Sequence, residues 1–407
     1  MSFSVVDIKK QFPALKQKFS GQDFVYLDTT NTSLKPQVVI DRIQEFYSYE
    51  SSNVHRGGYQ WSARTTQNFE NSRQKVAQFI GAKTADEIIF VRGTTEGINL
   101  VAHCLGQKFL IAGDEIIISE MEHHANIVPW HILQENLKIH VRAVKINDQG
   151  ELDLEHLKSL LNAKTKLVAL TACSNTTGTI TPFKQIINIV RQNSKAFVLA
   201  DGAQIVTEMP VSVNEWDVDF FVFSAHKIFG PTGVGVLYGK KEILDQFPPY
   251  QGGGSMINRV TLTHTTFNDV PLRFEAGTPH IEGVVALPTA LKFIEELGWE
   301  NIRSHKKALL NEATQMLKGL GNVNIYGEAK DKSAILSFNL MGLHHSDVAQ
   351  ILDEQGVAVR AGHHCTQPLM DRFKIPGCVR ASFSVYNDSF DIEKLKKGLI
   401  KARELLS

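Results

Sequence analysis

A lysine stands at the end of a run of apolar residues, a place where lysine is uncommon. The run covers residues 218–223, and the polar segment Ser224–Lys227 follows it directly. Lysine side chains are almost never fully buried without a partner, so the ordinary explanation is a solvated lysine in a turn. The alternative is chemical, because a lysine amine can form a Schiff base with an aldehyde cofactor. That alternative requires suitable acids, hydroxyl groups and a nucleophile elsewhere in the chain.

Two further polar segments could serve such a cofactor. Asp201 follows an apolar stretch and precedes a glycine. An Asp-Gly pair usually marks a turn, but in the chemistry of pyridoxal phosphate (PLP) an acid keeps the ring nitrogen protonated, so that the ring can accept electrons. Gly93, Thr94 and Thr95 lie between a predicted strand and a predicted helix, where backbone N–H groups and hydroxyls suit a phosphate. Threonine also caps helices without any ligand.

Two histidines and one cysteine are further candidates. His123 and His124 are adjacent in sequence. The side chains of adjacent residues seldom bind the same ion, so we expect no metal site. For His123, stacking on a flat cofactor is the alternative to a core histidine. Cys365 lies in a loop rich in glycine and histidine, five residues after Arg360. Free cysteine is usually a small buried hydrophobe, whereas a nearby arginine suits a thiolate nucleophile. Arg360 or Arg380 could clamp a substrate carboxylate.

The bulk composition narrows the class of protein. The 407 residues are 43% hydrophobic and 21% charged, which is ordinary for a globular protein. Basic and acidic residues balance at 43 each, which disfavours binding to nucleic acid or a membrane surface. We expect no signal peptide and no membrane helix, because no apolar run approaches the ~20 residues of a span. The four cysteines contain no CxxC pair, which predicts free thiols in a reducing compartment such as the cytoplasm.

Short apolar strands alternate with amphipathic helices along most of the chain. Strands are expected at 24–27, 87–91, 114–119, 139–144, 167–170, 196–200, 218–223 and 233–238, and helices at 5–19, 36–50, 65–80, 98–105, 183–191 and 283–297. This alternation predicts an α/β fold with a mostly parallel sheet. In such sheets ligands bind at the carboxyl ends of the strands. Polar clusters follow the strands at 93–95, 122–124, 174–175, 201–204 and 224–227, so they should meet at one edge.

The pattern changes after about residue 300. Helices are expected at 303–319, 346–354 and 391–406, and strands at 323–326, 335–340, 356–360 and 379–384. This order predicts a smaller α+β domain beside the large one. We expect the large domain to span residues 21–295. The small domain should combine residues 1–20 with 296–407 and carry the Cys365 loop.

Six segments, taken jointly, resemble a known family. They are residues 92–99, 121–126, 201–204, 224–227, 273–279 and 360–365, the last of which reads Arg-Ala-Gly-His-His-Cys. Over nearly its whole length the chain is similar to the cysteine desulfurases, which are fold-type-I PLP enzymes of the class-V aminotransferase family. It is most similar to their SufS-like second group, whose nucleophile loop reads Arg-x-Gly-His-His-Cys.

The resemblance implies a role for each candidate residue. Lys227 would carry PLP as a Schiff base, Asp201 would pair with the ring nitrogen, and His123 would stack on the ring. Further cofactor contacts would come from Thr94, Thr95, Asn175, Gln204, Ser224 and His226, and from Thr278 of the other subunit of a homodimer. The substrate L-cysteine would be held by Asn175 and Arg380, with Arg360, His55 and Arg56 lining the entrance.

The resemblance also implies the reaction. Lys227 would remove the α-proton of L-cysteine, and the Cys365 thiolate would attack its sulfur, leaving a persulfide and alanine. The sulfur would pass to an acceptor protein of iron–sulfur cluster assembly.

Other readings use the same features differently. A selenocysteine lyase or a cysteine sulfinate desulfinase would use the same site. An aminotransferase or a kynureninase-type enzyme would not need Cys365. A third possibility is a non-catalytic scaffold protein that binds PLP. Two segments depart from the family pattern: Asp28–Asn31, where the family usually has Asp-Ser-Ala-Ala, and Ala172–Asn175, where it commonly has His-Val-Ser-Asn. Both lie where the substrate is expected.

Overall fold

A seven-stranded sheet forms the centre of the large domain in the computed structural model, which describes residues 3–19 and 21–406. The strand order is β4-β10-β9-β8-β7-β5-β6. The strands are β4 (Ile88–Val91), β5 (Glu115–Ser119), β6 (His140–Val144), β7 (Thr165–Thr171), β8 (Phe197–Asp201), β9 (Phe220–Ser224) and β10 (Gly235–Gly239). Strand β10 is antiparallel to both of its neighbours, and the other pairs are parallel. The predicted α/β fold with a mostly parallel sheet is confirmed.

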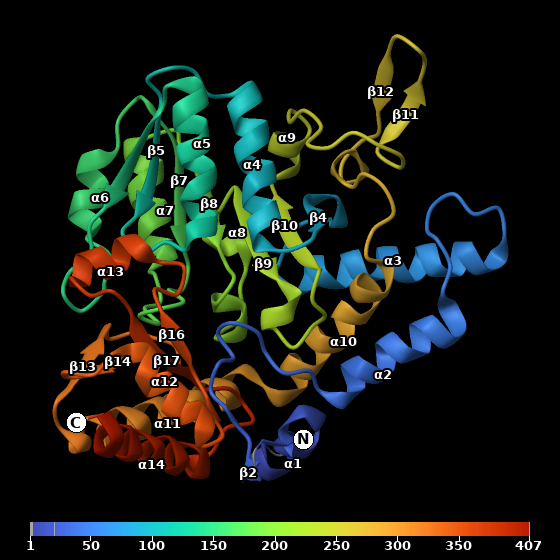
Figure 1. Ribbon diagram of the computed structural model, residues 1–407. Helices are drawn as coiled ribbons and strands as arrows, with labels where there is room; N and C mark the ends of the chain where they lie inside the picture. Colours follow the sequence, from blue (N-terminus) through green and yellow to red (C-terminus); the bar gives the residue numbers. More distant parts are fainter. Residues whose placement is uncertain (1–2, 20, 407) are drawn as a thin grey trace.

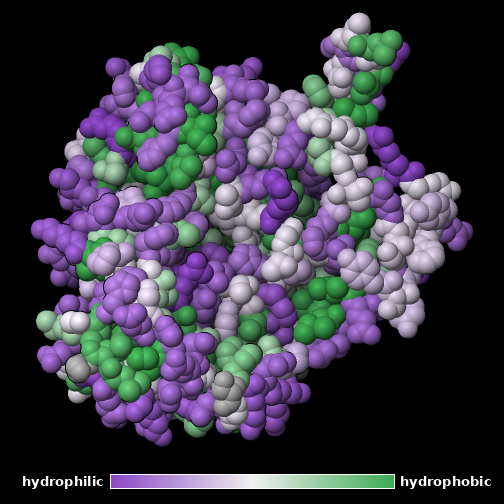
Figure 2. Space-filling model, viewed as in Figure 1, coloured by the Kyte–Doolittle hydropathy of each residue, from purple (hydrophilic) through white to green (hydrophobic). Residues whose placement is uncertain are grey.

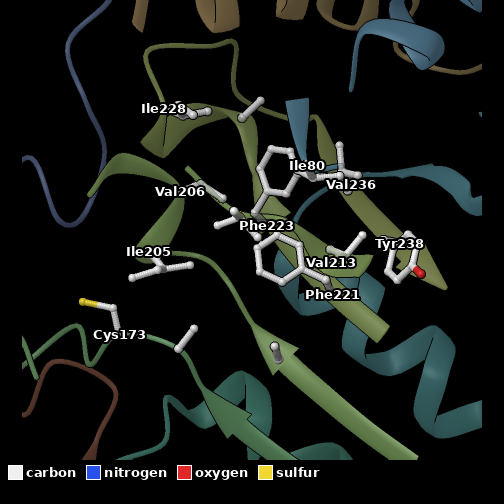
Figure 3. Packing of buried hydrophobic residues seen from close by; sticks show 14 of the residues in the cluster. Ile80, Cys173, Ile205, Val206, Val213, Phe221, Phe223, Ile228, Val236 and Tyr238 are labelled. Atoms are coloured by element: carbon white, nitrogen blue, oxygen red, sulfur yellow. The ribbon is translucent and has the colours of Figure 1, made fainter. Parts of the chain in front are cut away.

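Alternate residues of the central strands build two separate cores. On β9, Phe221 and Phe223 pack in the core on one face of the sheet, together with side chains of β10 (Figure 3). Phe220 and Val222 belong to the core on the opposite face. A strand that is buried on both faces reads as a continuous apolar run. This double burial explains why residues 218–223 show almost no polar alternation before the lysine.

Helices cover both faces of this sheet (Figure 1). One face is packed by α4 (Thr94–Lys108) and α5 (Val128–Leu137). The other is packed by α3 (Gln60–Phe79), α7 (Phe183–Asn193) and α10 (Ile281–Leu297). The remaining helices of this part of the chain are α2 (Gln37–Glu45), α6 (Leu154–Leu160), α8 (Val213–Trp216) and α9 (Lys241–Leu244).

The small domain is built on a four-stranded antiparallel sheet in the order β13-β14-β17-β16. Its strands are β13 (Val323–Tyr326), β14 (Ile335–Leu340), β16 (Arg360–Gly362) and β17 (Cys378–Ser382). The helices α11 (Trp299–Leu320), α12 (His345–Glu354) and α14 (Ser389–Leu406) share one apolar core with this sheet. Helix α13 (Gln367–Phe373) lies between the small-domain sheet and the large domain in Figure 1.

Several predicted boundaries differ from the structure. The expected helix at 5–19 is only α1 (Val5–Lys10) followed by a 3-10 turn, Pro13–Lys16, because proline cannot donate the backbone hydrogen bond of a continuing helix. Helix α4 begins at Thr94, four residues earlier than expected. The helices α5, α6 and α13 and the hairpin β11 (Ile257–Val260) to β12 (Thr265–Phe267) were not predicted.

The first residues of the chain connect the two domains. Strand β3 (Val25–Tyr26) pairs in parallel with β15 (Val357–Ala358), so it joins the small domain, although residues 21–295 were expected in the large one. Phe12, expected in the small domain, packs against Tyr386 of that domain and also against Phe229 and Phe293 of the large domain. These contacts join residues that are far apart in sequence, so the local sequence pattern could not predict them. Among the described residues, no helix has the length and apolar character to cross a membrane.

Candidate active site

The polar clusters after the strands meet around one cavity of about 190 Å³. Parallel strands that end at the same edge of a sheet bring their following loops together, which is why these segments converge. Nearly all of the predicted site residues line this cavity: Thr94, Thr95, His123, Asn175, Asp201, Gln204, Ser224, His226, Lys227, Arg360, Cys365 and Arg380. Of these residues, Arg360, Cys365 and Arg380 come from the small domain, so the cavity lies where the two domains face each other.

Lys227 and Asp201 lie on adjacent elements of this cavity. Burial lowers the pKa of Lys227 to about 8, a shift that Asp201 opposes and Arg380 reinforces. A lowered pKa increases the fraction of neutral amine, which is the nucleophilic form. Asp201 is 3% exposed and accepts one hydrogen bond, from the Ala203 N–H at 2.9 Å. Burial raises the pKa of Asp201, so a cationic group placed against its carboxylate would restore the charged form.

The start of α4 forms a cradle of hydrogen-bonding groups. The Thr94 N–H donates to Ser224 Oγ at 2.8 Å, and the two hydroxyl oxygens are also 2.8 Å apart. Strand β10 approaches this turn so closely that a Cβ on Gly235 would lie 2.4 Å from the Gly93 Cα. A helix N-terminus with free N–H groups and neighbouring hydroxyls attracts a phosphate. The cradle and the buried Asp201 carboxylate together fit a ring cofactor that carries a phosphate and a basic nitrogen.

Two histidines of the cavity are neutral. Burial, followed by the nearby Lys227 charge, lowers the pKa of His123 to about 3 and that of His226 to about 4. His123 Nδ1 accepts the Ala125 N–H at 3.0 Å, which fixes the ring and leaves its proton on Nε2. His226 Nδ1 lies 3.1 Å from the Thr32 hydroxyl. A neutral imidazole held in this way lines the cavity without adding charge.

Arg380 is a buried cation with an incomplete set of partners. It is 2% exposed and donates to the Asn175 carbonyl at 2.9 Å and to Asp28 Oδ1 at 3.0 Å. Its Nε has no hydrogen-bond partner within the described part of the chain. A guanidinium of this kind can bind a carboxylate in the cavity. The sequence did not single out Asp28 as its partner, although the place of Asp28 directly after a short strand was a signal.

Asn175 and Gln204 hold neighbouring loops in place. The Asn175 amide donates to the His364 carbonyl at 2.9 Å, which ties the large domain to the loop of Cys365. The Gln204 amide donates to the Thr30 carbonyl at 2.8 Å. Thr30 lines the cavity, as do Cys173 and Asn175, so both segments that depart from the family pattern contribute directly to the site.

Cys365 is presented by a turn with unusual backbone angles. Its φ is 58° and that of His364 is 52°, a left-handed conformation that non-glycine residues seldom adopt. The His124 N–H donates to the Cys365 carbonyl at 2.8 Å, and the Cys365 N–H donates to His363 Nδ1 at 3.1 Å. The Cys365 side chain is half-exposed, whereas Cys104, Cys173 and Cys378 are buried. The turn therefore holds one accessible thiol at the edge of the cavity.

Three predicted residues lie elsewhere in the single chain. His55 and Arg56 are held beside α3, where the His55 N–H donates to the Thr66 hydroxyl at 2.8 Å and the His55 ring packs on Phe69. Thr278 is exposed and lines a different cavity, of about 260 Å³. Their roles at the active site remain predictions, which for Thr278 requires a second copy of the chain.

The structure also adds residues to the site. Thr171, Cys173 and Ala203 line the cavity but were not assigned roles from the sequence. Thr171 ends β7, and that position was the available signal. Within residues 3–19 and 21–406, no group of three or more histidine, cysteine, aspartate or glutamate side chains is placed to hold a metal ion.

Comparison with known proteins agrees with this geometry. The profile of the class-V aminotransferase family matches residues 25–395. The chain is 45% identical to the cysteine desulfurases of Yersinia pseudotuberculosis and Pectobacterium atrosepticum, over the full length of both chains in each case. Among solved structures, the cysteine desulfurase CsdA from Escherichia coli superposes with a TM-score of 0.92 at 37% identity over 100% of both chains.

A second solved structure shows the same similarity. The cysteine desulfurase from Thermococcus onnurineus has a TM-score of 0.92 at 36% identity, with 98% of each chain covered. The predicted resemblance and the fold-type-I architecture are thus confirmed. The chain belongs to the class-V aminotransferase family and, within that family, to the cysteine desulfurases.

Proposed function

We propose that this protein is a PLP-dependent enzyme that converts L-cysteine to L-alanine and carries the sulfur as a persulfide on Cys365. The observation that carries this proposal is the meeting of two groups at one cavity. A lysine amine with a lowered pKa comes from the large domain, and an accessible thiol comes from the small domain. The thiol sets this function apart from aminotransfer, which does not need a cysteine nucleophile.

Different residues around the cavity would hold different parts of the cofactor. Lys227 would attach PLP through Nζ, Asp201 would face its ring nitrogen, and His123 would lie on its ring. The hydroxyls and N–H groups of Thr94, Thr95, Ser224 and His226 would hold its phosphate, and Gln204 its ring hydroxyl. PLP bound in this way supplies an electron sink for the charge that develops at the substrate α-carbon.

The protein groups then act on the substrate in turn. Arg380 binds the carboxylate of L-cysteine, supported by Asn175, and Lys227 accepts the α-proton at its amine. The Cys365 thiolate attacks the substrate sulfur, so that a sulfur–sulfur bond forms while the bond between the β-carbon and sulfur breaks. The electron pair left on the β-carbon takes up a proton, and Lys227 returns its proton to the α-carbon, which yields alanine. Cys365 retains the second sulfur as a persulfide, and no external oxidant or reductant is needed.

The persulfide must leave through a surface that another protein can reach. The half-exposed position of Cys365 supports transfer to an acceptor protein that supplies iron–sulfur cluster assembly. A buried thiol such as Cys173 or Cys378 could not be approached in this way.

We further propose that the enzyme works as a homodimer. Large apolar side chains are exposed on two projecting parts of the molecule, the α2–α3 region and the β11–β12 hairpin: Tyr47, Tyr49, Tyr59, Trp61, Val260, Leu262 and Phe267. The hairpin stands out from the body with hydrophobic residues along it (Figure 2). Groups of exposed apolar side chains often mark protein contacts. Burial of these surfaces against a second copy would also allow Thr278 to reach the phosphate of the neighbouring site.

Three variants test the proposed reaction. Wild-type protein should bind PLP and release alanine and sulfide from L-cysteine when a reductant is present. Cys365→Ala should keep the bound cofactor and lose sulfide release, whereas Lys227→Ala should lose both activity and the covalently held cofactor. Cys104→Ala, which removes a buried thiol outside the cavity, serves as the control and should stay active. Full desulfuration by Cys365→Ala would contradict the persulfide route.

A further inference from the structure

A second cavity lies between the two domains, separate from the active site. Its volume is about 230 Å³. The large domain contributes Ile180, Glu208 and Met209, and the small domain contributes α11 and the loop between β13 and β14. A cavity of this volume has room for several water molecules or one small molecule. Clefts at domain interfaces are preferred positions for small-molecule ligands.

Cationic side chains outnumber acidic ones around this cavity. The cations are Arg303, Lys306, Lys307, Lys330 and Lys332, and the acids are Glu208, Glu328 and Asp331. Lys306 and Glu208 form an ion pair with each other, and both side chains are nearly buried. Within the described part of the chain, the other four cations have no carboxylate within ion-pair distance. With five cations and three acids, the lining of the cavity has an excess of positive charge.

Lys332 is the least exposed of the four cations that have no ion pair. Its ammonium group donates one hydrogen bond, to the Gly327 carbonyl. An ammonium group carries three hydrogens, so two remain to be used. Burial lowers the pKa of Lys332 to about 8, and the nearby Glu328 opposes this shift only in part. An anion in the cavity would supply the missing compensation.

The wall of this cavity is connected to the active site. Lys332 and Thr179 form an isolated antiparallel bridge, and the Ser333 N–H donates to the Gly178 carbonyl at 2.8 Å. The loop that includes Gly178 and Thr179 follows β7 and also contains Asn175, which lines the active site. Lys306 and Glu208 also line a small space of about 20 Å³ that extends to Lys227. A ligand that fixes the position of this wall would therefore also affect residues that line the active site.

We propose that the interdomain cavity is a binding site for a small multivalent anion with carboxylate or phosphate groups. The anion would pair with Lys332 of the β13–β14 loop and with Arg303 of α11, and would thereby fix the loop that supports Asn175. This site is distinct from the one that would hold the cofactor phosphate, and its existence does not depend on the proposed reaction. Charge-assisted hydrogen bonds from a lysine and an arginine are strong enough to select such a ligand from chloride.

Calorimetric titration of the PLP-loaded enzyme tests this site. The probes are succinate, citrate, inorganic phosphate and sulfate, each at an ionic strength matched with potassium chloride, so that carboxylate and phosphate chemistry are compared directly. At least one probe should bind saturably with one anion per chain. Lys332→Met and Arg303→Ala should each weaken that binding by about tenfold, the loss expected for one charge-assisted contact. Lys292→Met, on the exposed side of α10, is the control and should bind normally.

The alternative outcomes overturn the proposal. If none of the four anions binds saturably, the cavity is not an anion site. If binding survives both Lys332→Met and Arg303→Ala, the anion lies elsewhere. Loss of binding in Arg360→Ala with full retention in Lys332→Met would place the anion in the active site instead. Because Arg303 is exposed, its variant remains informative even if Lys332→Met folds poorly.

Discussion

Replacement of Asp28 by asparagine tests how the proposed carboxylate site is built. Arg380 is buried, and its ion pair with Asp28 Oδ1 at 3.0 Å is the one carboxylate contact that it makes among the described residues. Asparagine keeps the size of the side chain and an oxygen that can accept the same hydrogen bond. It removes only the negative charge, so Arg380 becomes a buried cation without a counter-charge.

The expected loss of stability follows from the burial of this pair. Breaking a buried ion pair by removal of one partner costs about 3–5 kcal/mol. The Asp28 side chain is 16% exposed and the hydrogen bond can persist, so the loss should lie near the low end of that range. An unfolding entropy of about 2.1 cal/mol/K per residue gives roughly 0.9 kcal/mol/K for this chain. A loss of about 3 kcal/mol then lowers the Tm by about 3–4 °C.

The same substitution should improve substrate binding. Asp28 competes with the substrate carboxylate for the Arg380 guanidinium, so Asp28→Asn should lower the KM for L-cysteine while it lowers the Tm. Thermal unfolding and steady-state kinetics of the PLP-loaded enzyme measure both effects. Asp245→Asn is the control, because it breaks an exposed pair with Lys241 that contributes only about 0.3–0.5 kcal/mol. An unchanged Tm together with an unchanged or higher KM would refute the role of the Asp28 charge.

Three further changes can be measured. Uptake of PLP by the apoenzyme should accelerate with pH and reach half its maximal rate near pH 8, because burial lowers the pKa of Lys227 to about 8 and only the neutral amine attacks an aldehyde. Stopped-flow absorbance would show this, and a midpoint near the ordinary 10.5 would contradict it. Ser224→Ala should weaken PLP binding about tenfold in equilibrium dialysis, since it removes a hydroxyl from the phosphate cradle; wild-type affinity would exclude that contact. Gly235→Ala should destabilise the protein by about 1–3 kcal/mol in denaturant unfolding, because its methyl group would meet Gly93; an unchanged midpoint would mean that the backbone adjusts freely.

The sequence shows much of the large domain and its site because their signals are local. Buried strands of a parallel sheet read as apolar runs, and several polar residues proposed for the site end a strand or lie a few residues after one. Asp201 and Ser224 are the last residues of β8 and β9, and Thr94 starts the helix after β4. A parallel sheet places all of these positions at one edge. The short or half-exposed helices α5, α6 and α13 lacked a comparable signal.

What the sequence by itself determined is the chemistry: a lysine, an acid, a phosphate cradle and a thiol, each marked by its residue type and its place after a strand. Only the tertiary structure decided which distant residues meet. The pairing of β3 with β15, the partnership of Arg380 with Asp28, and the contact of Asn175 with the Cys365 loop all join segments that are far apart in the chain. Such contacts depend on how two domains pack, and no local periodicity records that packing. The position of Cys365 relative to Lys227 is of this kind, because it follows from the small domain facing the edge of the large sheet.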